Sequence, residues 1–246
     1  MPNVSIIMPA YNSGRFIEES IRSVIAQTYT NWELLVSDDC STDNTASIVA
    51  SFEDPRIHYL RNAHNMGAAR TRNNALKAAK GRYIAFLDSD DLWTPDKLEK
   101  QIAFMEQHHY AFTFADYQII NEDGSPQHKV LHMPASLTYH TYLRNTAIGC
   151  LTVVIDKEQT GYFEMPDIKS SHDFALWLLI MKRGFVAYSV PACLASYRLV
   201  ASSNTAKKWK AAQDVWRVYR EIEHLNIFYS AFCFCGYAIH AVLKRL

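Results

Sequence analysis

The sequence predicts an α/β protein with a mainly parallel central sheet flanked by helices. Within residues 1–107, short apolar runs alternate four times with amphipathic, helix-like stretches. Such βα units join parallel strands, and their helices cover both faces of the sheet. Polar clusters follow three of the four runs, at the carboxyl ends of the predicted strands. Ligands bind at this edge in α/β sheets, so the functional residues are expected there.

The elements of the first half follow from apolar periodicity and from the residues that begin helices. Continuous apolar runs of a few residues are typical of buried strands, whereas an apolar stripe at helical spacing is typical of a surface helix. Ser41–Asn44 and Thr94-Pro95 have the composition of helix starts. The predicted strands cover residues 4–8, 32–36, 57–60 and 83–87, and the predicted helices cover residues 14–27, 45–51, 67–79 and 95–107.

The second half has a less regular pattern. Strands are predicted over residues 111–120, 152–155, 186–190 and 194–197, with a hairpin turn at 121–124 and a helix over 172–182. Two further helices follow from Ala206. The expected organisation is one domain over residues 1–205, with halves 1–107 and 108–205, and a C-terminal helical extension over residues 206–246.

Composition and charge exclude several classes of protein. Lys and Arg number 25 and Asp and Glu number 25, whereas a nucleic-acid binder needs a basic excess or a basic face. A content of 49% hydrophobic and 20% charged residues indicates a globular chain. Five scattered cysteines do not form a disulfide scaffold, and the N-terminus begins with an apolar strand instead of a secretory leader. A cytoplasmic protein is therefore expected.

Carboxylates accumulate at the predicted ligand-binding edge. Asp38 and Asp39 follow the second strand, and Asp88, Asp90 and Asp91 follow the fourth. Like charges this close repel one another unless a cation lies among them. Mg²⁺ or Mn²⁺, bound by one or two carboxylates and by substrate phosphates, would relieve the repulsion. The GxGxxG, GxxxxGK[ST] and HExxH motifs are absent, so three other common nucleotide or metal sites are excluded.

Three segments resemble those of family 2 glycosyltransferases in their amino acids, their order and their spacing. They are VSIIMPAYN at residues 4–12, WELLVSDDCSTDNT at 32–45 and GRYIAFLDSDD at 81–91. The resemblance covers nearly the whole chain. It implies a GT-A fold, a nucleotide-sugar donor, a divalent metal ion and an inverting mechanism. Small members of this family commonly build repeat units of lipopolysaccharide O-antigen, capsule or lipooligosaccharide.

The resemblance also assigns roles to individual residues. Asp39 matches the carboxylate that recognises the base, usually uracil, and Asp90 matches the metal ligand of the DXD motif, with Asp88 at the ribose or the metal shell. Arg72 matches an arginine that faces the nucleotide, although the alanine that usually precedes it is Thr71 here. The nucleotide site implied in this way comprises Pro9, Ala10, Tyr11, Asp39, Arg72 and Asp88.

The catalytic base implied by the resemblance is Asp173. An inverting transfer needs a carboxylate that takes the proton from the attacking acceptor hydroxyl. The family supplies it at the start of a late helix, often as Glu-Asp before Leu-Trp, and the matching stretch here is SHDFALW at 171–177. His172 replaces the usual preceding acid. The alternative for Asp173 is a carboxylate that only stabilises the helix N-terminus.

The C-terminal segment raises a separate question. Residues 227–243 are apolar nearly all round but shorter than the roughly 20 residues of a membrane-spanning helix. The basic residues of the upstream KKWK motif at 207–210 and of Lys244-Arg245 flank this run. A peripheral contact with the inner face of the cell membrane is favoured, and a helix packed on the domain or in a homodimer is the alternative.

The sequence thus predicts an inverting, metal-dependent hexosyltransferase. Its donor would be a UDP-sugar, its cofactor Mn²⁺ or Mg²⁺, and its acceptor a sugar hydroxyl on a lipid-linked or polysaccharide chain. A nucleotide-sugar-binding module without transferase activity and a nucleotidyltransferase remain as alternatives. The intact DXD motif beside a candidate base argues against the first. The poor match of residues 11–15 to a basic, glycine-rich loop argues against the second.

Overall fold

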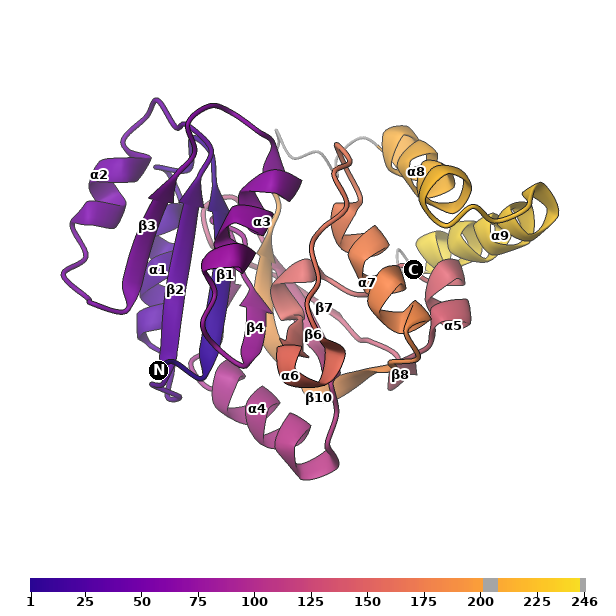
Figure 1. Ribbon diagram of the computed structural model, residues 1–246, viewed down its shortest axis with the longest axis horizontal. Coiled ribbons are helices and arrows are strands. Elements are labelled where there is room, and N and C mark those ends of the chain that lie inside the picture. Colours follow the sequence, from indigo (N-terminus) through magenta and orange to yellow (C-terminus); the bar gives the residue numbers. More distant parts are fainter. Residues whose placement is uncertain (201–207, 244–246) are drawn as a thin grey trace.

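The computed structural model describes residues 1–200 and 208–243, and in this part of the chain ten strands form one central sheet (Figure 1). The strand order is β3-β2-β1-β4-β9-β6-β10-β5, with β7 beside β6 and β8 beside β10. The strands are β1 (Val4–Ala10), β2 (Trp32–Asp38), β3 (Ile57–Arg61), β4 (Tyr83–Phe86), β5 (Leu92–Trp93), β6 (Phe112–Ile120), β7 (Pro126–Leu131), β8 (Ser136–Leu137), β9 (Val154–Asp156) and β10 (Ala187–Arg198).

Helices lie on both faces of this sheet, as predicted. The helices are α1 (Ile17–Ile25), α2 (Thr45–Ala50), α3 (Ala68–Ala78), α4 (Lys97–His108), α5 (Tyr139–Arg144), α6 (Lys157–Thr160), α7 (His172–Lys182), α8 (Lys208–Arg217) and α9 (Ile227–Leu243). Helix α8 continues into a π-helical turn at Val218–Ile222, and a 3₁₀ turn at Cys150–Thr152 precedes β9.

Alternate residues of β1 supply the two hydrophobic cores. Ile6 and Met8 pack in one core with α1 and α4, whereas Ile7 packs in the other core with α3 and α7. Since successive side chains of a strand point to opposite faces, the fully apolar run of β1 requires cover on both sides. The sheet is thereby sandwiched, and only its strand ends remain open for a ligand site.

The sheet is parallel in its first half and mixed in its second. Strands β3, β2, β1 and β4 are parallel, as are β6 and β10, but β9 runs antiparallel between β4 and β6. The predicted hairpin at 121–124 is present, because β6 and β7 pair antiparallel around it. The expectation of a mainly parallel sheet therefore holds best for the half that carries the DXD motif.

Several elements differ from the sequence-based expectation. Strand β1 continues through Pro9 to Ala10, which is tolerated because its β4 neighbour has already ended at Phe86. Helix α4 begins at Lys97, two residues late, since the Thr94 hydroxyl bonds the Asp96 side chain at 2.8 Å instead of capping. The two strands predicted near 190 form a single β10 with register shifts. The two-residue strand β5 was not predicted.

The C-terminal helices pack into the same core as the rest of the chain. Val215, Val218, Tyr219 and Cys233 are buried there together with residues of α5 and α7. The predicted boundary at 205/206 lies outside the described residues, as do Lys207 and the Lys244-Arg245 pair. No helix in the described ranges is long and apolar enough to cross a membrane.

Candidate active site

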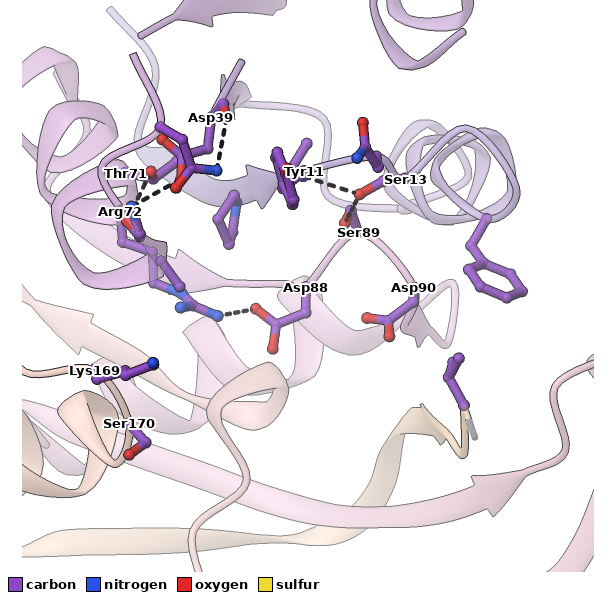
Figure 2. Close-up of a pocket in the computed structure, with 18 of the residues that line it drawn as sticks. Tyr11, Ser13, Asp39, Thr71, Arg72, Asp88, Ser89, Asp90, Lys169 and Ser170 are labelled. Atoms are coloured by element: carbon purple, nitrogen blue, oxygen red, sulfur yellow. Dashed lines mark hydrogen bonds and ion pairs between the residues drawn. The ribbon is translucent and has the colours of Figure 1, made fainter. Parts of the chain in front are cut away.

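A cavity of about 710 Å³ opens at the carboxyl ends of β1, β2 and β4 (Figure 2). It lies where the polar clusters of the sequence predict a ligand site. The structure brings all the nucleotide and metal candidates to its wall, namely Pro9, Ala10, Tyr11, Asp39, Arg72, Asp88 and Asp90. Asp173 is the one predicted site residue that does not line this cavity.

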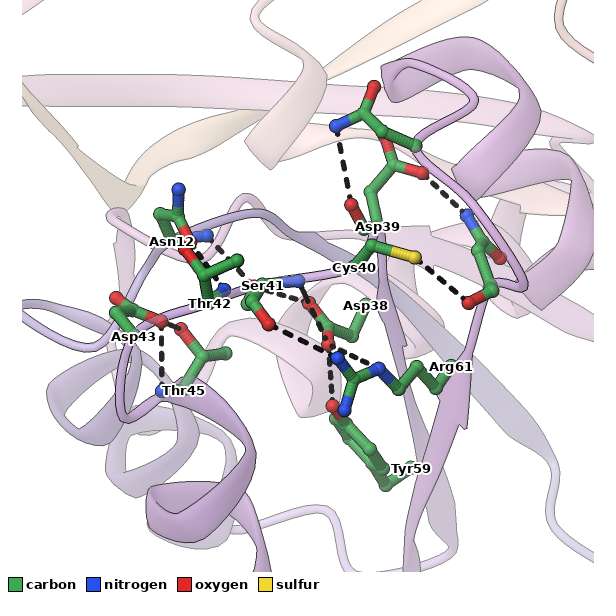
Figure 3. A network of polar contacts seen from close by, with 12 residues as sticks. Asn12, Asp38, Asp39, Cys40, Ser41, Thr42, Asp43, Thr45, Tyr59 and Arg61 are labelled. Atoms are coloured by element: carbon green, nitrogen blue, oxygen red, sulfur yellow. Dashed lines mark hydrogen bonds and ion pairs between the residues drawn. The ribbon is translucent and has the colours of Figure 1, made fainter.

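Hydrogen bonds join the loops after β1 and β2 into one wall of the cavity (Figure 3). The Asn12 backbone N–H donates to Ser41 Oγ at 2.8 Å, and the Thr42 N–H donates to Asn12 Oδ1 at 2.9 Å. Asp43 accepts from the Gly14 N–H at 2.9 Å. Asn12 and Cys40 have φ values of 49° and 64°, a left-handed conformation that these contacts hold in place. The wall is therefore set before any ligand arrives.

The Asp39 carboxylate is hydrogen-bonded to other groups of the protein. One carboxylate oxygen accepts from the Met66 N–H at 2.7 Å and from Asn62 Nδ2 at 2.8 Å, and the other accepts from the Gly67 N–H at 2.8 Å. Burial raises the pKa of Asp39, but these hydrogen bonds outweigh it and hold the pKa below its ordinary value. Thr71 is a fourth hydrogen-bond donor to this carboxylate, which also lines the cavity. Asp39 thus fixes the 62–67 loop as well as facing the cavity.

The Asp88 and Asp90 side chains lie next to each other in the loop after β4 (Figure 2). Burial and the charge of Asp88 raise the pKa of Asp90 to about 6. The Ser89 hydroxyl lies 2.8 Å from that of Ser13 and ties this loop to the one after β1. Among the described residues, no cluster of three or more His, Cys, Asp or Glu side chains could hold a metal ion. Asp88 and Asp90 could therefore hold a cation if a substrate supplied the further ligands.

Arg72 connects the Asp88 loop to the start of α7. Its guanidinium forms an ion pair with Asp88 and donates to His172 Nε2 at 2.8 Å. Burial alone would lower the pKa of Arg72, but the charge of Asp88 keeps it above its ordinary value. Burial and the guanidinium lower the pKa of His172, so its imidazole is neutral and can accept from Arg72. His172 therefore takes part in the site as a partner of Arg72.

Asp173 is in the first turn of α7 and does not line the cavity. The preceding loop contributes Lys169 and Ser170 to the cavity, opposite Tyr11 in Figure 2. The carboxylate of Asp173 is close enough to Arg72 to raise the pKa of that guanidinium. The structure thus brings Asp173 near the predicted nucleotide site without placing it in the same wall.

Sequence reasoning missed Arg198, at the end of β10. This buried side chain donates from Nε to the Asp90 carbonyl at 2.8 Å and pairs with Glu19 at 2.6 Å. Its backbone N–H donates to Asp91 at 2.9 Å, so Asp91 anchors the loop to the end of β10. The only sequence signal was an arginine directly after an apolar strand, which gives no hint of a partner more than 100 residues away. Lys210 of α8 also lines the cavity and was not assigned to it.

Comparison with known families agrees with this geometry. Residues 5–165 match the model of "Glycosyl transferase family 2". TuaG of Bacillus subtilis, named for teichuronic acid biosynthesis, is 51% identical over 100% of this chain and 98% of its own length. WfgD of Escherichia coli, a "UDP-Glc:alpha-D-GlcNAc-diphosphoundecaprenol beta-1,3-glucosyltransferase", is 45% identical over 87% of this chain and 84% of its own.

Solved structures share the fold. TarS of S. aureus in complex with UDP-GlcNAc superposes with a TM-score of 0.73 at 22% identity, over 97% of this chain and 72% of that chain. The mannosyltransferase PcManGT of Pyrobaculum calidifontis, in complex with GDP-Man and Mn²⁺, gives a TM-score of 0.70 at 17% identity, over 99% and 75%. The predicted fold class is confirmed, and the family model matches most of this chain. The chain therefore belongs to glycosyl transferase family 2 and is a glycosyltransferase of the GT-A fold.

Proposed function

We propose that this glycosyltransferase moves a hexose from a UDP-sugar to a sugar hydroxyl of a lipid-linked acceptor, with inversion and with a divalent cation. The observation that carries the proposal is the Asp88–Asp90 pair, which lies in a cavity of about 710 Å³ and is held from two sides by Arg72 and Arg198. Two half-buried carboxylates side by side at a strand end repel each other unless a cation lies among them.

The two carboxylates fit a cation that also binds phosphate. The pKa of Asp90, raised to about 6 by burial and by Asp88, reports repulsion that a positive charge would relieve. Asp90 would hold Mn²⁺ or Mg²⁺, with Asp88 in or beside its shell. Such a cation would stabilise the negative charge that develops on the diphosphate leaving group.

The nucleoside would lie against the wall built by the loops after β1 and β2. Pro9, Ala10 and Tyr11 line the cavity, and the Asp39 carboxylate, which accepts hydrogen bonds only, suits the ring N–H of uracil. The Tyr11 side chain is 55% exposed and free to pack on the base or ribose. Arg72 would face the nucleotide while it holds Asp88.

Asp173 would act as the general base. It would take the proton of the acceptor hydroxyl as that oxygen attacks the anomeric carbon and the UDP oxygen leaves from the opposite face. The resemblance supports this role, and so does its place beside Arg72 at the start of α7. Since Asp173 does not line the cavity, the acceptor itself or a shift of the 169–171 loop would have to bring the hydroxyl to it.

The acceptor class follows from the named relatives. WfgD is named for a GlcNAc-diphosphoundecaprenol acceptor, and TuaG is named for teichuronic acid biosynthesis. Two cations at the cavity, Lys169 and Lys210, suit an acceptor that carries a diphosphate. The enzyme would then work in the cytoplasm, at the inner face of the cell membrane.

Acceptor-dependent release of UDP tests this function against the alternatives. UDP-glucose, UDP-galactose and UDP-GlcNAc would each be incubated with Mn²⁺ and a short-chain GlcNAc-diphospholipid. Release of UDP only when the acceptor is present supports the transferase. Donor binding without release would identify a nucleotide-sugar-binding module, and release of pyrophosphate from UTP and a sugar phosphate would identify a nucleotidyltransferase.

A further inference from the structure

Helix α9 presents an exposed apolar face. This outer stripe consists of Ile227, Phe228, Ala231, Phe232, Cys235, Ala238 and Ile239, all of which are exposed. The larger members are 86% (Phe228), 57% (Phe232) and 60% (Ile239) exposed, and they recur at helical spacing along one side. Contiguous exposed apolar surface of this kind marks an interaction site.

The opposite face of α9 is fixed against the protein. Ser230 and Cys233 are fully buried, and the Phe234 ring packs edge-on against Trp216 of α8 at 5.6 Å. A Cβ on Gly236 would lie 2.8 Å from Arg144 Cβ of α5, so the two helices touch closely. The helix therefore cannot rotate to hide its outer stripe without breaking this packing.

The exposed side of α9 is unusually apolar for a surface helix. Residues 227–243 contain no Asp, Glu, Lys or Arg, and Phe228 and Phe232 face outward with His240 as the exposed polar residue, whereas Ser230 is buried against the protein. A surface helix normally turns its polar side to water. The outer stripe is thus built for an apolar partner.

We infer that the outer stripe docks on an anionic lipid surface. One margin of the stripe is basic, because the Arg144 guanidinium lies 5.6 Å from the Phe232 ring centroid, and the sequence continues after residue 243 with Lys244-Arg245. Cations around an apolar helix face are the pattern of interfacial helices on anionic membranes. The helix of a second copy would offer the Arg144 guanidinium no opposite charge, because residues 227–243 contain no Asp or Glu, so charge favours an anionic membrane.

This surface lies one helix away from the cavity. Helix α8 packs on α9 through Trp216 and also contributes Lys210 to the cavity wall. Figure 1 shows α8 and α9 together at one end of the molecule. With α9 on the membrane, the cavity would face an acceptor whose lipid stays in the bilayer. The inference deepens the proposed function at this point, but binding of vesicles does not depend on it.

Co-sedimentation with vesicles tests the inference. The full-length protein should bind vesicles of equal parts phosphatidylglycerol and phosphatidylcholine more tightly than vesicles of phosphatidylcholine alone. Phe232→Glu should weaken binding by about tenfold or more, because a buried phenylalanine contributes at least that much. Tyr162→Glu, in the loop after α6, is the matched control with 58% exposure and should bind like wild type.

Two further measurements keep the result unambiguous. Phe232→Glu should transfer sugar to a water-soluble acceptor at the wild-type rate. If the wild-type protein shows no transfer to this acceptor, that result refutes the proposed function and leaves the docking surface untouched. Failure of wild type to bind anionic vesicles, or equal weakening by Tyr162→Glu, would overturn the inference. So would sedimentation velocity that shows a dimer dissociated by Phe232→Glu, because the stripe would then be a contact between copies.

Discussion

Asp173 is the residue on which the proposed proton transfer depends. Asn has the size of Asp but does not accept a proton at neutral pH. Asp173→Asn should therefore slow turnover by about two orders of magnitude or more, the usual scale for a positioned base. Donor affinity should stay close to wild type, since donor contacts are assigned to Asp39, Arg72 and Asp90. Steady-state turnover and titration calorimetry with the donor measure the two quantities.

A matched control separates a base from a helix-terminal carboxylate. Asp167 lies just before α7, but its exposed side chain pairs with Arg70 at 2.5 Å, outside the cavity wall. Asp167→Asn should leave turnover within about twofold of wild type, because an exposed ion pair contributes little. Near-normal turnover in Asp173→Asn would assign Asp173 to the helix N-terminus and move the base to another group.

Single residues of the site were predictable where a local motif contains them. Asp88 and Asp90 follow an apolar strand, and that pattern alone indicates a site at a strand end. Two sets of hydrogen bonds could not be predicted, because both join segments far apart in the sequence. Asp39 accepts from the 62–67 loop, and Arg198 donates to the Asp90 carbonyl. Sequence reasoning thus found residues that line the cavity and missed the groups that hold them in place.

Helix α4 carries a buried cation that makes stability depend on pH. The Lys97 side chain is fully buried, donates to Gln101 at 3.0 Å and lies 4.0 Å from the centre of the Trp93 ring. Burial lowers the pKa of Lys97 to about 7. In the unfolded chain the pKa returns to about 10.4, so between these values the unfolded state binds more protons and stability rises with pH.

Between pH 6 and pH 9, Lys97 should add about 2.5 kcal/mol to the rise in the free energy of unfolding, as the linkage relation gives for these pKa values. Lys97→Met should remove that rise. Lys100→Met is the control, because Lys100 lies on the same helix but is exposed and paired with Asp96. Urea unfolding at several pH values measures the effect, and equal pH dependence in wild type and Lys97→Met would show that the ammonium is not desolvated as described.

Elements with strong periodicity were predicted well, and short or interrupted ones were not. Helix α7 covers the predicted residues 172–182 because its ends and apolar pattern are local features. Strand β10 was taken for two strands because Pro191 interrupts it, although the chain continues past a register shift beside β6. Strand β5 has two residues and exists only through its pairing with β10, which no local pattern encodes.

The whole molecule shows how the halves predicted from sequence become one site. The parallel β1–β4 half supplies the DXD loop, while β10 returns from the second half to hold that loop through Arg198. The antiparallel insertion of β9 between β4 and β6 brings the two halves together. Sequence periodicity predicted both halves but not this pairing, because strand order depends on contacts across the whole chain.

The central claim is that the Asp88–Asp90 pair and a divalent cation hold the diphosphate of UDP. Calorimetric titration of UDP into wild type and Asp90→Asn, each with Mn²⁺ and with chelator, tests it most directly. Wild type should lose at least about tenfold in affinity without Mn²⁺, or about 1.4 kcal/mol. Asp90→Asn should bind weakly and equally with and without the metal. Equal UDP affinity of wild type in Mn²⁺ and in chelator would contradict the claim.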